Sequence, residues 1–278
     1  MTKLPRSRSH PKKQEVEKVK EPKVPATKSA AFDTEDTGYE NVKPGDLIVP
    51  RYTILQGLSP QVTKGKPEYD AEARVGQIYN IGLQEVVGEE LHFLPVHYTK
   101  TYLEWAPRSS GKGLVAVHED SSILDRAPRD DKGRPTLKNG NYIAETAQFF
   151  GFDLNGKTPR KIFIPMASTQ LKKARRLLTL AMSEEITLDN GTTRVPPIYY
   201  RTYKLTTVPE SNQEGSWVGW KIERDTALPD MDNWQELVET AKRFRSALTA
   251  GKVKGDMAGV EGEHPAQRSH GDDESEAL

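Results

Sequence analysis

Apolar residues alternate with polar ones, or form short apolar runs, in eight stretches between residues 46 and 224. Alternation with a period of two places successive side chains on opposite faces of an extended chain, so each stretch predicts a β-strand. Pro95 lies inside the longest stretch. Because proline has no amide hydrogen to donate, it indicates an edge strand or a bulge there. The eight stretches are residues 46–55, 76–82, 90–105, 113–118, 142–154, 160–166, 198–207 and 216–224.

Two further stretches have the period of an α-helix. In residues 169–185 the apolar positions fall on one helical face, and Ser168 stands where a serine hydroxyl caps a helix. In residues 232–250, Asp232 and Gln235 have the spacing of an N-cap residue and its N3 partner. The apolar stripes are Leu171, Ala174, Leu177, Leu178, Ala181 and Met182 in the first helix, and Trp234, Leu237, Val238, Ala241, Phe244 and Leu248 in the second.

These elements predict an α+β protein with a small, mainly antiparallel β-sheet or β-barrel and two helices. Residues 142–154 and 160–166 are expected to pair through the turn at Asn155-Gly156, and residues 198–207 to pair with 216–224. An OB-like barrel is one arrangement of such strands, and it is a fold that suits oligonucleotides. The number of strands does not distinguish it from other small barrels.

The globular part is predicted to be a single domain over residues 43–250. Residues 1–42 contain Lys-Pro and Lys-Glu repeats with almost no large apolar side chains, and residues 251–278 are poor in them too. A segment of this kind buries too little surface to offset its loss of conformational entropy. We therefore expect a disordered basic N-terminal arm and a disordered acidic C-terminal tail.

Charge is distributed unevenly, although the net charge of the whole chain is zero. Residues 1–28 carry nine Lys and Arg against three Glu, a net of +6, whereas residues 255–278 carry seven Asp and Glu against one Arg, a net of −6. Opposite charges at the two ends are typical of interaction tails. The alternative is that both ends are simply solvated extensions.

Composition excludes several classes of site. The chain has no cysteine, so it has no disulfide, no Cys-based zinc site and no thiol nucleophile. No run of residues approaches the roughly 18 consecutive apolar residues of a membrane span, and the basic N-terminus lacks the apolar stretch of a signal peptide. The sequence therefore predicts a protein that stays in the cytoplasm, away from membranes.

A search for catalytic motifs finds none. The sequence has no GxxxxGK[ST], no GxGxxG after a strand, no HExxH and no GxSxG. The nearest approach to a metal-binding pair is Asp130-Asp131, which we interpret as part of a solvated loop. We predict a protein that is not an enzyme and has no cofactor and no metal. A metal-dependent nuclease whose carboxylates escape recognition remains an alternative.

Aromatic residues alternate with basic ones in two of the predicted strands. With a spacing of two, the three residues of each group share one strand face. Tyrosine rings can stack on unpaired bases, at about 1–3 kcal/mol per base, while Lys and Arg neutralise phosphates. The alternative is that tyrosine is simply a good strand residue at the edge of a core. The two groups are Tyr98, Lys100 and Tyr102, and Tyr199, Arg201 and Tyr203.

The first predicted helix carries basic residues near its N-terminus. Cations at this end oppose the helix dipole, so phosphate attraction is a better explanation for them than helix stability; a solvated basic face is the alternative. Trp217 and Trp220 lie three apart on a predicted strand and so point to opposite faces. One is expected in the core, and Trp217 is included among the candidate stacking residues. The basic residues are Lys172, Lys173, Arg175 and Arg176.

Four segments resemble a group of bacteriophage proteins encoded among replication and recombination functions. The resemblance covers most of residues 45–225 and carries no transferable binding residue. It rests on PRYTILQGLSPQV (50–62), VGQIYN (75–80), LPVHYTKTYLEW (94–105) and STQLKKARRLLT (168–179).

The layout resembles that of phage and bacterial single-stranded DNA-binding proteins, in which an OB-like body precedes a flexible acidic tail. In those families the tail recruits replication partners and competes with DNA for the basic cleft. Here the tail GDDESEAL (271–278) ends in Leu278 instead of an aromatic residue, which makes recruitment less certain than DNA binding. The resemblance implies a partner-binding role for Asp272, Asp273, Glu274 and Glu276.

The sequence thus leads to one main hypothesis, a phage protein that binds single-stranded DNA during replication or recombination in the host cytoplasm. Stacking tyrosines and phosphate-binding cations would hold the strand. The alternatives are a phage structural or host-interaction protein without nucleic-acid binding, and a metal-dependent nuclease. Oligomeric state and the preference between DNA and RNA stay open.

Overall fold

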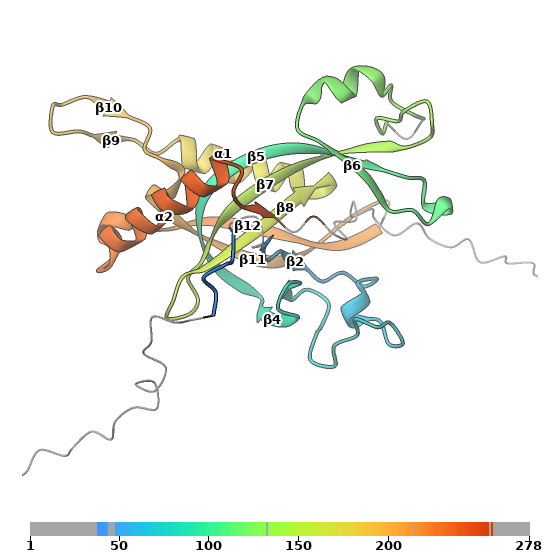
Figure 1. Ribbon diagram of the computed structural model, residues 1–278, viewed down its shortest axis with the longest axis horizontal. Coiled ribbons are helices and arrows are strands. Elements are labelled where there is room, and N and C mark those ends of the chain that lie inside the picture. The colour runs from blue at the N-terminus through green and yellow to red at the C-terminus, as the bar shows by residue number, and fades with distance from the viewer. Residues whose placement is uncertain (1–37, 44–47, 132, 214, 256, 258–278) are drawn as a thin grey trace, which may run out of the picture. The chain divides into compact units, whose positions relative to one another are not determined.

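The computed structural model describes residues 38–43, 48–131, 133–213, 215–255 and 257 (Figure 1). The chain divides into two compact units, Met1–Val42 and Lys43–Leu278, and the described helices and strands all belong to the second. The predicted basic arm lies largely outside the described residues. The same is true of the acidic residues Asp272, Asp273, Glu274 and Glu276.

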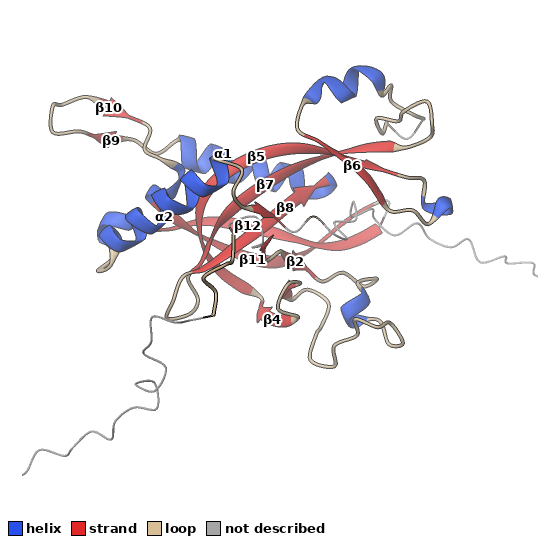
Figure 2. Ribbon diagram, in the orientation of Figure 1, coloured by secondary structure: helices blue, strands red, loops and turns tan. Residues whose placement is uncertain are grey.

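A six-stranded antiparallel sheet forms the centre of this unit (Figure 2). Its strands run in the order β12-β11-β5-β7-β8, and β6 pairs with the far end of β5. The prediction of a mixed protein dominated by strands is therefore confirmed. The strands are β5 (Glu90–Trp105), β6 (Leu114–His118), β7 (Tyr142–Asp153), β8 (Arg160–Ala167), β11 (Arg201–Asn212) and β12 (Gly215–Ala227).

Smaller strand groups accompany the main sheet. Three strands form an antiparallel sheet in the order β2-β3-β4, β1 pairs in parallel with β13, and β9 and β10 form a hairpin after the first helix. Six short 3₁₀ segments are also described. The bounds of these strands are β1 (Ile48–Val49), β2 (Tyr52–Ile54), β3 (Ile78–Asn80), β4 (Glu85–Gly88), β9 (Ile186–Thr187), β10 (Thr193–Arg194) and β13 (Lys254–Gly255). The 3₁₀ segments are η3 (Pro60–Val62), η4 (Arg108–Ser110), η5 (Ser121–Arg126), η6 (Ser168–Gln170), η7 (Ile198–Tyr200) and η8 (Leu228–Asp230).

The two helices, α1 (Leu171–Met182) and α2 (Trp234–Thr249), cover opposite faces of the main sheet. Phe149 and Phe150 are neighbours on β7, so their side chains point to opposite faces. Phe149 belongs to the core cluster that contains Leu177 of α1. Phe150 belongs to the cluster that contains Phe244 of α2. Most of each predicted apolar stripe thus packs on the sheet, whereas Met182 and Trp234 are 68% and 39% exposed.

Both helices begin later than predicted. Ser168 has a positive φ of 49° and opens the 3₁₀ segment η6, so it does not cap α1. Asn233, and not Asp232, precedes α2, and its side chain makes no capping hydrogen bond. The two predicted N-caps are therefore wrong, because the 3₁₀ segment η6 precedes α1, and η8 followed by a turn precedes α2.

The sheets do not close into a barrel, so the expected OB-like closure is not confirmed. The edge strand β12 has its main chain bonded by side chains instead of by another strand. Gln56 accepts a hydrogen bond from the Val218 amide and donates one to the Val218 carbonyl, both at 2.9 Å. Gln170 accepts from the Trp220 amide at 3.1 Å. These side chains satisfy part of the main chain along the edge of the sheet.

Strand β5 contains a register irregularity next to the candidate site. Its pairing with β7 shifts between Pro95 and His97, in agreement with the bulge that the proline predicted, although β5 is a central strand. On the other side, β11 pairs with β5 only as far as Phe93, and β6 begins to pair at Tyr102. Residues 94–101 therefore have no partner strand on that side within the described part of the chain.

Candidate nucleic-acid interface

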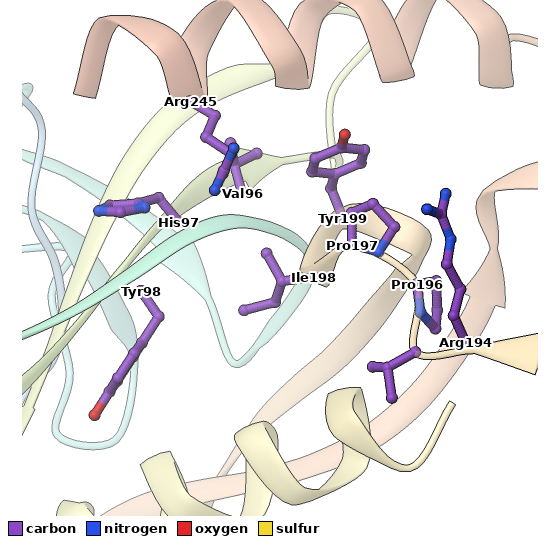
Figure 3. Close-up of a pocket in the computed structure, with 10 residues that line it drawn as sticks. Val96, His97, Tyr98, Arg194, Pro196, Pro197, Ile198, Tyr199 and Arg245 are labelled. Carbon is purple, nitrogen blue, oxygen red and sulfur yellow. The ribbon is translucent and has the colours of Figure 1, made fainter. Parts of the chain in front are cut away.

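A hollow of about 560 Å³ lies where β5 lacks a partner strand (Figure 3). Strand β5 contributes Val96, His97 and Tyr98, and α2 contributes Arg245. Residues 194–199 form the remaining wall. This segment runs from the end of β10 into η7. Figure 3 shows Arg245 reaching from α2 toward His97, whereas Tyr98 leaves β5 on the opposite side from His97.

The hollow is positively charged. Arg194 and Arg245 are both exposed, and neither takes part in an ion pair among the described residues. No acidic side chain is found among the residues that line it. Burial, reinforced by the nearby positive charge of Arg245, lowers the pKa of His97 below its ordinary value of 6.5. At neutral pH the lining therefore carries two guanidinium charges beside a neutral imidazole.

The first aromatic and basic group shares a strand face, as predicted, but core side chains cover much of that face. Tyr98 is half-buried, with its ring centroid 5.1 Å from that of Phe149. The Lys100 ammonium lies 2.7 Å from the Glu145 carboxylate. Tyr102 is only 8% exposed and packs in a small core cluster. Of these three residues, the structure places only Tyr98 at the hollow.

The second group does not form a common strand face, so this part of the prediction is wrong. Tyr199 lies in η7, and the pairing of β11 with β12 shifts between Arg201 and Tyr203. Tyr203 is 1% exposed, and burial raises its pKa to about 12. Arg201 donates to Glu184 at 2.9 Å and to the Asp225 carbonyl at 2.7 Å. Only Tyr199 reaches the hollow, because η7 interrupts the predicted strand.

The basic face of α1 is only partly available to a ligand. Lys172, Arg175 and Arg176 are exposed and form no ion pair in the part of the chain that the structure describes. Lys173 is ion-paired with Glu210, a carboxylate that also accepts a hydrogen bond from the Trp217 indole at 3.0 Å. These contacts occupy Lys173 and hold Trp217 half-buried.

Trp220, the other tryptophan of β12, is buried in the core cluster under α1. This confirms that one of the two tryptophans belongs to the core. Gly219 lies between Val218 and Trp220 and provides space for the Glu210 carboxylate, because a Cβ there would lie 2.3 Å from Glu210 Oε2. A side chain at this position would require the Glu210 carboxylate to shift.

The three side chains of the hollow that carry imidazole or guanidinium nitrogens, His97, Arg194 and Arg245, were not predicted as binding residues. No local pattern marks them, because Arg194 ends a two-residue strand and Arg245 lies on the exposed side of an amphipathic helix. Their common feature is convergence on the bulge of β5. Such convergence depends on how elements far apart in the sequence pack together.

Two other expectations concern metals and membranes. Asp130 is bonded to Arg134 at 3.0 Å, so this carboxylate already has a protein cation as its partner. Among the described residues no group of three His, Asp or Glu side chains gathers in a way that could hold a metal ion. No helix in the described part of the chain is long and apolar enough to span a membrane.

Comparison with known proteins places the chain in a phage family. No curated protein and no solved structure matches it. A protein-family model described as "Pam3 phage gp34-like protein" matches residues 17–254. The match covers most of the chain, and the protein therefore belongs to the Pam3 phage gp34-like family.

Proposed function

We propose that this phage protein binds single-stranded DNA and that the hollow beside β5 holds one nucleotide of the bound strand. The observation that carries the proposal is that Arg194, Arg245 and Tyr199 line one hollow without acidic side chains. The guanidinium groups of Arg194 and Arg245 would bind phosphate, and Tyr199 would contact a base. Its volume lies within the range of roughly 300–1,000 Å³ that is usual for small-molecule sites.

A tyrosine in the hollow favours binding of an unpaired strand over a duplex. A tyrosine can stack only on a base whose face is free, and the bases of a duplex are stacked on each other. The free cations of α1, Lys172, Arg175 and Arg176, lie on the helix that packs on the Tyr98 side of the sheet. They would add attraction for neighbouring phosphates. In this proposal the protein acts without catalysis in phage DNA replication or recombination in the host cytoplasm.

Fluorescence anisotropy with a labelled single strand tests the proposal. We expect the protein to bind the single strand more tightly than the matching duplex, and less tightly as salt rises. Tyr199→Ala is expected to weaken binding to the single strand about fivefold to a hundredfold, the loss of one stacked base. Tyr69→Ala is the control, because Tyr69 is exposed and does not line the hollow.

Three outcomes would contradict the proposal. The first is that the protein fails to bind the single strand at low salt, and the second is that it binds the duplex equally well. The third is that the Tyr199→Ala and Tyr69→Ala variants bind the single strand with equal affinity. Thermal unfolding of each variant shows whether it is folded before binding is compared. Loss of the labelled strand that depends on magnesium would instead favour the nuclease alternative.

The lowered pKa of His97 predicts a pH dependence of binding. His97 is neutral at neutral pH, and below its lowered pKa it gains a positive charge beside Arg245. A bound phosphate favours this charged form, so affinity for the single strand should increase as the pH falls below 6.5. Anisotropy titrations from mildly alkaline to mildly acidic pH measure the effect. In His97→Asn the increase should be clearly smaller, and an equal increase in that variant would assign the effect to other histidines.

A further inference from the structure

Strands β12, β8 and β6 form the edges of the main sheet, and the first two are covered. Gln56 and Gln170 bond the main chain of β12, as described above. On β8, the Phe163 amide donates to the Pro50 carbonyl at 2.9 Å. Strand β6 pairs only with β5 in the described part of the chain, and it lies at the periphery in Figure 2. Its outer edge is therefore open to another strand.

The side chains of β6 do not discourage such pairing. Natural proteins protect open edges with charged residues, proline or bulges. The sequence of β6 is LVAVH, which contains neither proline nor an acidic residue nor lysine. Its pairing with β5 has one irregularity, a register shift between Glu104 and Trp105. Val115 and Val117 are 50% and 44% exposed, and Val117 lies opposite the buried Leu103 on β5. The strand thus presents an apolar face that continues the core of the sheet.

We propose that β6 pairs with β6 of a second copy of this chain, in antiparallel orientation about a two-fold axis at Ala116. In this register Val115 of each copy lies opposite Val117 of the other, so all four exposed valines pack together. A shift by two residues would place one of the valines opposite Gly113 or Glu119 instead. A two-fold contact of this kind requires the same surface from both copies, and β6 is self-complementary in this sense.

Charges at the two ends of β6 support the same register. Lys112 precedes the strand, and Glu119 and Asp120 follow it. Antiparallel pairing about Ala116 brings Lys112 of each copy to the Glu119-Asp120 end of the other. The two-fold axis repeats this attraction, so the contact gains two sets of opposite charges. A parallel pair of the same strands would instead place like charges together.

Cysteine cross-linking tests the register directly, because the chain has no cysteine of its own. Opposite residues in an antiparallel pair have Cα atoms about 4.5–5.5 Å apart, which suits a disulfide. Ala116→Cys should therefore form a covalent dimer rapidly under mild oxidation. Thr249→Cys, at the exposed end of α2, is the control for random collisions and should cross-link much more slowly.

Sedimentation without DNA tests the contact itself. The unmodified protein is expected to be a dimer at micromolar concentration, and Val117→Lys should make it a monomer with unchanged thermal unfolding. Val75→Lys changes a valine that is 53% exposed elsewhere, and this variant should stay dimeric. Lys112→Glu should weaken the dimer, and adding Glu119→Lys should restore it, since the double change exchanges the charges.

A monomeric unmodified protein whose Ala116→Cys variant cross-links no faster than the control would overturn the proposal. So would dimer formation that appears only after removal of residues 258–278, because β6 would then be the docking site of the chain's own tail. Dimer formation is independent of nucleic acid. Failure of this proposal therefore leaves the proposed binding of single-stranded DNA unaffected, and the reverse also holds.

Discussion

Replacing both Arg194 and Arg245 with alanine should weaken binding to single-stranded DNA about tenfold to a hundredfold at low salt. Both guanidinium groups face one hollow and lack an ion-pair partner among the described residues, so a phosphate there is their natural partner. Each lost contact with a phosphate lowers the slope of log affinity against log salt by about 0.7 for a single strand. We therefore expect the slope to decrease by about 1.4 in the double variant.

The matched control removes the same charge elsewhere. Arg126 and Arg243 are exposed and do not line the hollow. Replacing both with alanine changes the net charge equally, so it should alter long-range attraction alone and leave most of the affinity intact. Anisotropy titrations at several salt concentrations give both affinity and slope. Equal losses in the two double variants would show that overall charge, and not the hollow, governs binding.

Gly151→Ala should strongly destabilise the main sheet. Gly151 lies on β7 opposite Pro95, beside the bulge of β5. A Cβ there would lie 2.2 Å from the Leu94 carbonyl oxygen and 2.5 Å from the Phe93 ring. The main-chain oxygen is fixed in the strand and cannot move aside as a flexible side chain can. Because overpacking a well-packed core typically costs about 1–3 kcal/mol, we expect a loss of stability at or above the upper end of this range.

Denaturant unfolding of Gly151→Ala measures this loss. Gly156→Ala is the control, since Gly156 lies in the connection between β7 and β8 and its nearest contact would be 3.8 Å away. The free energy of unfolding of the control should lie within about 1 kcal/mol of that of the unmodified protein. A stable Gly151→Ala variant would mean that β5 can move away from β7 at the bulge. Since the hollow is built at that bulge, such movement should also be visible as altered DNA binding.

The periodicity of apolar residues predicted the long strands and the two helices well. Residues 90–105 were expected as one strand with an irregularity at Pro95, and β5 has those bounds and a register shift there. The stripes through Leu177 and Phe244 predicted two helices whose apolar faces are buried. A period of two or of 3.6 is a property of the neighbouring residues themselves, so it can be read without knowing the fold.

The same patterns did not predict which residues line the candidate site. Spacing shows that Tyr98, Lys100 and Tyr102 share a face, but not that α1 and a small core cluster would cover most of it. Alternation through Tyr199 and Tyr203 suggested one strand, whereas Tyr199 lies in the 3₁₀ segment η7 and a register shift follows between Arg201 and Tyr203. Whether a tyrosine stacks on a ligand or on the core depends on its burial, which is decided by segments elsewhere in the chain.

The sequence by itself therefore determined the strands of the main sheet, the two helices, the absence of cysteine chemistry and the uneven charge of the chain. The tertiary structure alone decided that the sheet stays open and that Arg194, Arg245, His97, Tyr98 and Tyr199 meet at one hollow. The physical reason is that strand and helix periods follow from neighbouring residues, whereas a binding hollow forms where distant segments fail to cover a strand. In this protein that place is the unpaired stretch of β5 between β11 and β6.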